Sequence, residues 1–127
     1  MQQVETAAGV QVRVIREPSV YVVGRQLVDD RELDRFLAEH GVSWESDSEV
    51  ASEVLAESAG RICYMSFSRP RPGGNSTYLN HIKESGHGSV LEHAVWNLVF
   101  CGVSRSLTHE LIRHRAGMGF SQLSQRY

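Results

Sequence analysis

Cationic and hydrogen-bonding side chains gather in residues 113–127 of this sequence. Arg113-His114-Arg115 comes first, two glycines follow, and the stretch ends in hydroxyl, amide and guanidinium donors, Ser121-Gln122-Leu123-Ser124-Gln125-Arg126-Tyr127. Guanidinium groups bind phosphates through charge-assisted hydrogen bonds, and Gly117 and Gly119 let backbone approach a ligand closely. The pattern predicts a site for a phosphorylated ligand. The alternative is a solvated helix end, where the helix dipole also favours Arg and His.

The charge distribution also favours an anionic ligand. Residues 1–60 carry 5 basic and 12 acidic residues, whereas residues 61–127 carry 8 basic and 3 acidic ones, for a net charge of −2 overall. Arg outnumbers Lys twelve to one, which suits phosphate recognition but is equally expected from codon bias. A nucleic-acid-binding domain is a weaker alternative, because the net charge is negative and Trp44 and Trp96 lie far from the arginine cluster.

The histidines do not predict a metal site. His109 and His114 are five positions apart, about 140° around a regular helix, so they cannot bind one ion together. No cysteine or carboxylate completes a ligand set around them. A serine-hydrolase triad is not predicted either, since the sequence has no Gly-x-Ser-x-Gly turn.

The first half predicts strands followed by two helices. Val10, Val12 and Val14 alternate with polar residues and predict a half-buried strand, which residues 21–23 continue or pair with. Gly24 predicts a turn. Residues 30–40 predict a helix that Asp29 or Asp30 caps and Gly41 ends. Residues 48–64 predict a second helix with these residues on one face: Val50, Val54, Leu55, Ile62 and Cys63.

The second half predicts the elements that position the arginine cluster. Residues 66–75 are expected to form a loop, and a short helix capped by Asn75 or Ser76 ends at Gly86. Residues 94–101 are apolar and predict a buried strand. Ser104 or Ser106 starts a last helix, which residues 113–115 close.

The whole pattern predicts an α+β fold, a mixed domain with an antiparallel or mixed sheet flanked by helices. A length of 127 residues predicts a single domain. No apolar run approaches the roughly 20 residues that span a membrane, so no membrane association is expected. Cys63 and Cys101 are far apart and form no Cys-x-x-Cys pair, which favours a reducing, cytoplasmic location.

Three blocks, in this order, resemble the flavin-dependent thymidylate synthase family: Gly86-His87-Gly88-Ser89-Val90-Leu91-Glu92-His93, then residues 102–115 (GVSRSLTHELIRHR), then residues 121–127 (SQLSQRY). The resemblance covers about residues 56–127, with Arg61-Ile62-Cys63-Tyr64 as a weaker early match. It identifies this chain as the N-terminal part of a longer member, because family members are usually much longer.

The resemblance implies roles for individual residues. The FAD-binding set would be His87, Ser89, Arg113, His114, Arg115 and Gln122. The dUMP-binding set would be Glu110, Arg113, Gln122, Leu123, Ser124, Gln125 and Arg126, with Arg126 on the phosphate. No residue is assigned a certain catalytic role. Ser124 is expected to position the substrate, because no base beside it is predicted and an unactivated hydroxyl is a poor nucleophile.

The resemblance also implies a reaction, the methylation of dUMP at C5 to give dTMP. Methylenetetrahydrofolate would supply the one-carbon unit and NADPH the electrons, through FAD. A homotetramer with active sites shared between subunits is implied, and the 127-residue piece alone is expected to be inactive. A non-catalytic flavin- or nucleotide-binding module is the alternative.

One departure from the family pattern concerns the nucleotide. The family usually has seven residues between Arg-His-Arg and the motif serine, whereas Ala116 to Leu123 makes eight here. The extra residue falls beside the expected position of the nucleotide sugar. A related uridylate such as UMP is therefore an alternative substrate.

Overall fold

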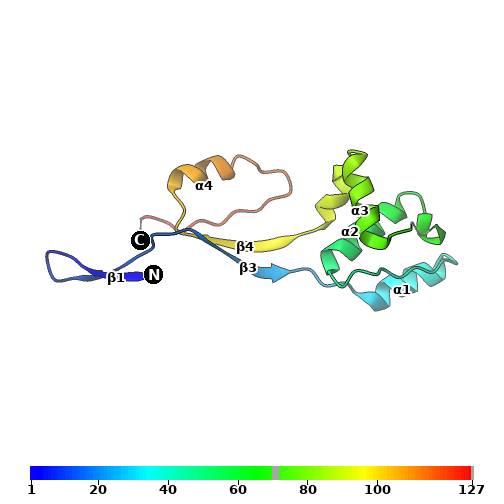
Figure 1. Cartoon of the computed structure of the whole chain (residues 1–127), viewed down its shortest axis with the longest axis horizontal. Helices are drawn as coiled ribbons and strands as arrows, with labels where there is room; N and C mark the ends of the chain where they lie inside the picture. Colours follow the sequence, from blue (N-terminus) through cyan, green and yellow to red (C-terminus); the bar gives the residue numbers. More distant parts are fainter. Residues whose placement is uncertain (70–71, 127) are drawn as a thin grey trace. The chain divides into compact units, whose positions relative to one another are not determined.

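The computed structural model describes residues 1–69 and 72–126 and contains strands, α-helices and short 3-10 helices (Figure 1). Their order is β1 (Gln2–Glu5), β2 (Gln11–Val14), β3 (Ser19–Arg25), α1 (Asp30–Glu39), α2 (Ala51–Ile62), η1 (Ser66–Ser68), α3 (Gly74–Glu84), η2 (Gly88–His93), β4 (Trp96–Cys101) and α4 (Arg105–Leu111). The predicted α+β class is confirmed. None of the helices in the described ranges has the length and apolar character needed to cross a membrane.

The chain divides into two compact units. The terminal unit comprises Met1–Val23 and Leu98–Tyr127, and the central unit comprises Gly24–Asn97. The boundary falls inside β3 and inside β4, two strands that pair with each other. A single domain over residues 1–127 stays a prediction.

The predicted strand around Val12 is confirmed as β2, but its partner is β1. The two strands form an antiparallel hairpin in which Gln2 lies opposite Val14. Val10 and Val12 are 56% and 38% exposed, so the prediction of a half-buried strand is wrong for them. A two-stranded hairpin has no second layer to cover its faces.

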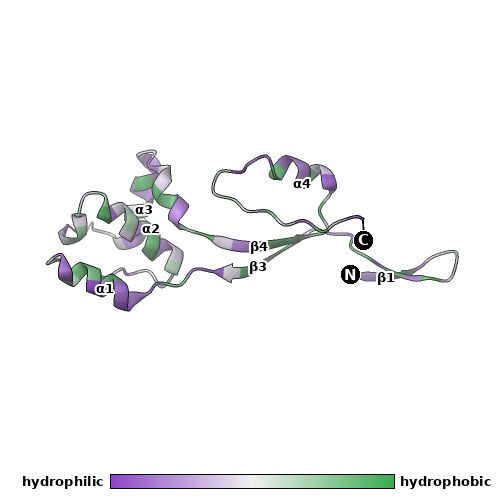
Figure 2. Cartoon of the chain, turned by 180° about the vertical axis from the view of Figure 1, so that it is seen from behind, coloured by the Kyte–Doolittle hydropathy of each residue, from purple (hydrophilic) through white to green (hydrophobic). Residues whose placement is uncertain are grey.

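Residues 21–23 belong to β3, which pairs with β4 and neither continues β2 nor pairs with it. The predicted turn at Gly24 is wrong, because Gly24 lies within β3. A Cβ there would lie 2.8 Å from the side-chain nitrogen of Asn97, so glycine permits a close approach to β4. The predicted strand of residues 94–101 is confirmed as β4. The predicted burial of β4 is wrong, since Leu98 and Phe100 are 46% and 44% exposed. Figure 2 shows part of β4 in green, the colour of hydrophobic residues.

Helix α1 confirms the local signals in the sequence. The side chain of Asp29 accepts a hydrogen bond from the backbone N–H of Glu32, which satisfies a donor that the first turn leaves unpaired. Gly41 follows the helix with φ of +66°, the left-handed conformation that commonly ends a helix. Leu37 is buried and Phe36 packs edge-on against Phe67.

Helix α2 is confirmed, but its buried face differs from the predicted one. Val50, Ile62 and Cys63 are exposed. The buried residues are Ser52, Ala56, Glu57, Ser58, Gly60 and Arg61. The difference arises because Glu57 and Arg61 pair with each other inside the central unit, where hydropathy alone would not place them.

Arg61 joins several parts of the central unit. Its guanidinium donates to the backbone carbonyls of Ser66 and Arg69, at 2.8 and 3.3 Å. It also lies over the rings of Trp44 and Tyr78, with centroid distances of 5.6 and 5.0 Å. Hydrogen bonds and cation–π contacts together compensate the desolvation of this buried charge.

The loop predicted over residues 66–75 is shorter than expected. Ser66–Ser68 form η1, and α3 begins at Gly74, while Pro70 and Arg71 lie outside the described residues. Neither Asn75 nor Ser76 caps α3, because Asp47 accepts a hydrogen bond from the backbone N–H of Asn75 at 2.7 Å instead. The predicted stop is confirmed, since Gly86 follows Ser85 with φ of +70°.

The apolar core of the central unit lies between α2 and α3. Its buried members are Ala56, Tyr78, Leu79 and Ile82, and Val90 and Leu91 of η2 pack against them. Gly60 lets α2 approach Tyr78 closely, because a Cβ at this position would lie 2.3 Å from the tyrosine hydroxyl oxygen. This contact explains why the glycine interrupts an otherwise ordinary helical sequence.

Candidate functional site

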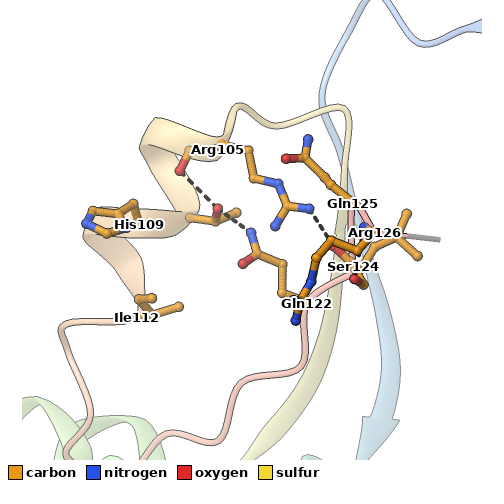
Figure 3. A pocket seen from close by; sticks show the side chains of 9 residues that line it. Arg105, His109, Ile112, Gln122, Ser124, Gln125 and Arg126 are labelled. Carbon is orange, nitrogen blue, oxygen red and sulfur yellow. Dashed lines mark hydrogen bonds between the residues drawn. The ribbon is translucent and has the colours of Figure 1, made fainter.

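A pocket of about 560 Å³ lies in the terminal unit between α4 and the segment that ends the described chain (Figure 3). Its lining comes from Arg105, Thr108, His109, Ile112, Gln122, Leu123, Ser124, Gln125 and Arg126. The pocket therefore contains residues 122–126 of the donor-rich stretch that the sequence singles out.

Helix α4 presents one of its faces to this pocket. Arg105, Thr108, His109 and Ile112 follow the i, i+3, i+4, i+7 spacing of a single helical face. The helix begins where expected, because the Ser104 hydroxyl accepts the backbone N–H of Leu107 at 3.1 Å. This cap fixes the start of the helix and so the positions of all four side chains.

Side chains from α4 hold the opposite wall in place. The guanidinium of Arg105 donates to the backbone carbonyl of Leu123. The side-chain nitrogen of Gln122 donates to the hydroxyl oxygen of Thr108, and this hydroxyl donates in turn to the carbonyl of Arg105 at 3.1 Å. Two tertiary hydrogen bonds thus join α4 to residues 122 and 123. They hold this wall of the pocket in place although residues 122–126 have no regular secondary structure.

The electrostatics of the pocket favour an anion. Its described lining contains two arginines and no carboxylate. Neither Arg105 nor Arg126 forms an ion pair within residues 1–69 and 72–126. Two guanidinium groups without acidic partners produce a positive potential that a phosphate or carboxylate ligand would neutralise.

Ser124 lies in the pocket without a basic partner. Its hydroxyl accepts the backbone N–H of Arg126 at 3.2 Å, and no histidine or carboxylate of the described chain bonds to it. The hydroxyl hydrogen therefore stays available to a ligand oxygen. This arrangement suits binding better than nucleophilic attack, which requires an adjacent base.

The structure brings together only part of the predicted site. Residues 122–126 line the pocket, whereas Glu110, Arg113, His114 and Arg115 do not. Glu110 and Arg113 form an exposed ion pair at 3.8 Å. The prediction that residues 113–115 close the last helix is wrong, because α4 ends at Leu111. The chain forms tighter, 3-10-type turns after the helix, because the backbone N–H groups of Arg113 and His114 donate to carbonyls three residues earlier.

His87 and Ser89 belong to the central unit. His87 precedes η2 and Ser89 lies in its first turn. Neither residue lines the pocket. The predicted flavin-binding set is therefore divided between the two units, and its assembly stays a prediction.

The sequence pattern did not predict that α4 contributes one side of the pocket. No binding role was assigned from the sequence to the four α4 residues of the lining, Arg105, Thr108, His109 and Ile112. Their spacing was the available signal, because it places polar and cationic groups along one helical face. Which segment faces them could not be read from spacing, since that depends on the return of the chain at residues 122–126.

Comparison with known proteins identifies the family. Residues 47–127 match the model of the family described as Thymidylate synthase complementing protein. A flavin-dependent thymidylate synthase of Corynebacterium aurimucosum is 53% identical over 95 residues, which cover 72% of this chain and 38% of the relative. Enzymes of the same name from Mycobacterium sp. (strain JLS) and Mycobacterium leprae are 56% and 52% identical, over 68% and 72% of this chain.

The match covers most of this chain but a minor part of each relative. The chain spans 34% of the Mycobacterium sp. protein and 36% of the Mycobacterium leprae protein. The family model covers both the α4 segment and the motif that line the pocket. This chain belongs to the Thymidylate synthase complementing protein family.

Proposed function

We propose that this chain supplies the nucleotide-binding part of a flavin-dependent thymidylate synthase that methylates dUMP at C5 to give dTMP. The observation that carries the proposal is the pocket with Arg105 and Arg126 in its lining and no described carboxylate. Family membership and the names of the relatives support it.

The chemistry of the pocket suits a nucleotide monophosphate. Arg105 and Arg126 offer N–H groups to phosphate oxygens. Ser124 offers a hydroxyl, and the amides of Gln122 and Gln125 offer both donors and acceptors for the sugar and the base. Ile112 and Leu123 add apolar surface, which a nucleotide base can cover. We assign the phosphate to the arginines and Ser124.

The turn after α4 fits a flavin pyrophosphate by its donor set. Arg113, His114 and Arg115 are exposed in consecutive positions, and among them only Arg113 has a described ion-pair partner, at 3.8 Å. Together with Gln122, and with His87 and Ser89 of the central unit, they are the residues that would hold FAD. When bound, the flavin supplies the redox chemistry of the reaction.

The remaining reaction components belong to the same proposal. NADPH would be the reductant and methylenetetrahydrofolate the one-carbon donor. A homotetramer whose subunits share active sites is part of the same proposal. In that assembly Glu110 and Arg113 would approach the nucleotide from the end of α4.

One feature favours a second candidate substrate, UMP. The connection from Ala116 to Leu123 is eight residues long, and Gly117 adopts φ of +71° within it. Leu123, at its end, lines the pocket. A longer connection next to the sugar would leave more room for a 2′-hydroxyl group.

Three measurements test the proposed function. The purified protein should absorb near about 450 nm, as oxidised flavins do, and should bind dUMP. Tritium release from C5-labelled dUMP should require both NADPH and methylenetetrahydrofolate in the protein that contains the whole family sequence. Nucleotide binding without tritium release would favour the alternative, a non-catalytic binding module. If the protein binds neither dUMP nor UMP, the proposal is rejected.

A further inference from the structure

The pocket contains a hydrogen-bond relay that runs from the backbone of α4 to the side chain of Gln122 (Figure 3). The hydroxyl of Thr108 is its middle member. A hydroxyl carries one hydrogen, and that of Thr108 is directed to the carbonyl of Arg105 at 3.1 Å. With its hydrogen on this carbonyl, Thr108 accepts from the side-chain nitrogen of Gln122.

These two hydrogen bonds favour one orientation of the Gln122 amide. Gln122 presents its side-chain nitrogen to Thr108 at 2.5 Å, the orientation in which both hydrogen bonds form together. An amide rotated by 180° could bond to Thr108 only if the hydroxyl hydrogen left the carbonyl of Arg105, so the rotated arrangement makes one hydrogen bond fewer. The carbonyl oxygen of Gln122 is thereby left to the pocket, where no group of the described chain bonds to it.

Thr108 is well placed for such a role. It is part-buried, whereas Arg105, His109 and Gln122 around it are exposed. It lies in the middle of α4, whose start is fixed by the Ser104 cap. The relay thus begins on a backbone group of a capped helix and passes through one rigid, β-branched side chain.

We propose that Thr108 is a positioning residue that keeps the carbonyl oxygen of Gln122 facing the pocket, as an acceptor for a hydrogen-bond donor of the bound nucleotide. The proposal rests on the proposed function, since it requires a nucleotide in the pocket. The nucleotide dUMP offers two neutral donors of this kind, the 3′-hydroxyl of the sugar and the N3–H of the uracil ring. The shared chemistry is a donor directed at an amide carbonyl.

The experiment measures nucleotide preference by calorimetry in the full-length protein. The probes are dUMP, dCMP, whose ring N3 carries no hydrogen, and 2′,3′-dideoxyuridine monophosphate, which lacks the 3′-hydroxyl. Wild type should bind one of the two analogues about three- to tenfold more weakly than dUMP, the effect of one neutral hydrogen bond. The analogue that loses affinity identifies the donor.

Two matched variants then test the relay. Thr108→Val keeps the β-branched shape and removes the hydroxyl, so the amide of Gln122 can rotate and the analogue penalty should fall below about twofold. Thr108→Ser keeps the hydroxyl and should restore the wild-type penalty. The readout is a ratio between nucleotides, which a general loss of folding or of pocket shape would not change selectively.

The outcomes separate this inference from the proposed function. Absence of any dUMP binding by wild type overturns the proposed function and the relay with it. Binding of dUMP without a penalty for either analogue overturns the relay alone. The relay is likewise overturned if Thr108→Val keeps the full penalty, or if Thr108→Ser loses it.

Discussion

The guanidinium of Arg61 lies 2.7 Å from the carboxylate of Glu57, and both side chains are almost fully buried in the central unit, at 4% and 3% exposure. The second carboxylate oxygen of Glu57 accepts from the side-chain amide of Asn75 at 2.7 Å. Arg61 in turn holds the carbonyls of Ser66 and Arg69. One ion pair therefore ties α2 to the start of α3 and to η1.

Breaking this ion pair should destabilise the protein strongly. Glu57→Gln removes one charge and leaves Arg61 buried without its counterion, at a cost of about 3–5 kcal/mol in the free energy of unfolding. Urea denaturation measures the change. The matched control is Glu32→Gln, in an exposed pair with Arg35, which should cost less than about 1 kcal/mol. Equal effects of the two variants would contradict the prediction.

Gly60→Ala should destabilise α2 although alanine is the better helix former. The exchange gains about 1 kcal/mol of helix propensity. The new Cβ would lie 2.3 Å from the hydroxyl oxygen of Tyr78, a residue that is only 8% exposed. Overpacking of this kind costs about 1–3 kcal/mol. Thermal unfolding should therefore show a lower midpoint.

The second half of that test uses Tyr78→Phe. In this background the atom closest to the new Cβ is absent, and the next one lies 3.2 Å away. Gly60→Ala should then cost less than it does in wild type. An equal cost in both backgrounds would show that the tyrosine hydroxyl is not the source of the strain.

Arg126→Ala should weaken dUMP binding. Loss of a hydrogen bond from a charged group to phosphate costs about 1.5–3 kcal/mol, or roughly tenfold to 150-fold in Kd. The control is Arg13→Ala, which removes the same charge from the exposed face of β2, outside the pocket. Calorimetry of both variants distinguishes a local contact from a general charge effect. Equal affinities of the two variants for dUMP would reject the phosphate role of Arg126.

A polypeptide of residues 1–127 alone should show no turnover. It corresponds to 34–38% of the length of the relatives that it matches. Tritium release from labelled dUMP measures the activity, and the protein with the whole family sequence is the positive control. Turnover by the 127-residue polypeptide would show that its own residues suffice.

Elements whose signals are local were predictable. Asp29 and Gly41 delimit α1, and Ser104 starts α4, because a cap satisfies backbone groups within its own turn. Residue type also singled out residues 122–126, which the pocket gathers, and their binding role stays a prediction. Their chemistry depends on residue type, which sequence states directly.

Features that depend on distant partners were not predictable from spacing. The buried face of α2 was misassigned because Glu57 and Arg61 satisfy each other and further groups only once α3 and η1 are in place. The α4 half of the pocket was missed for the same reason, since Thr108 acquires its role from Gln122, 14 residues away. Local patterns determine where helices begin and end, whereas burial of polar groups is decided by the partners that the tertiary structure brings to them.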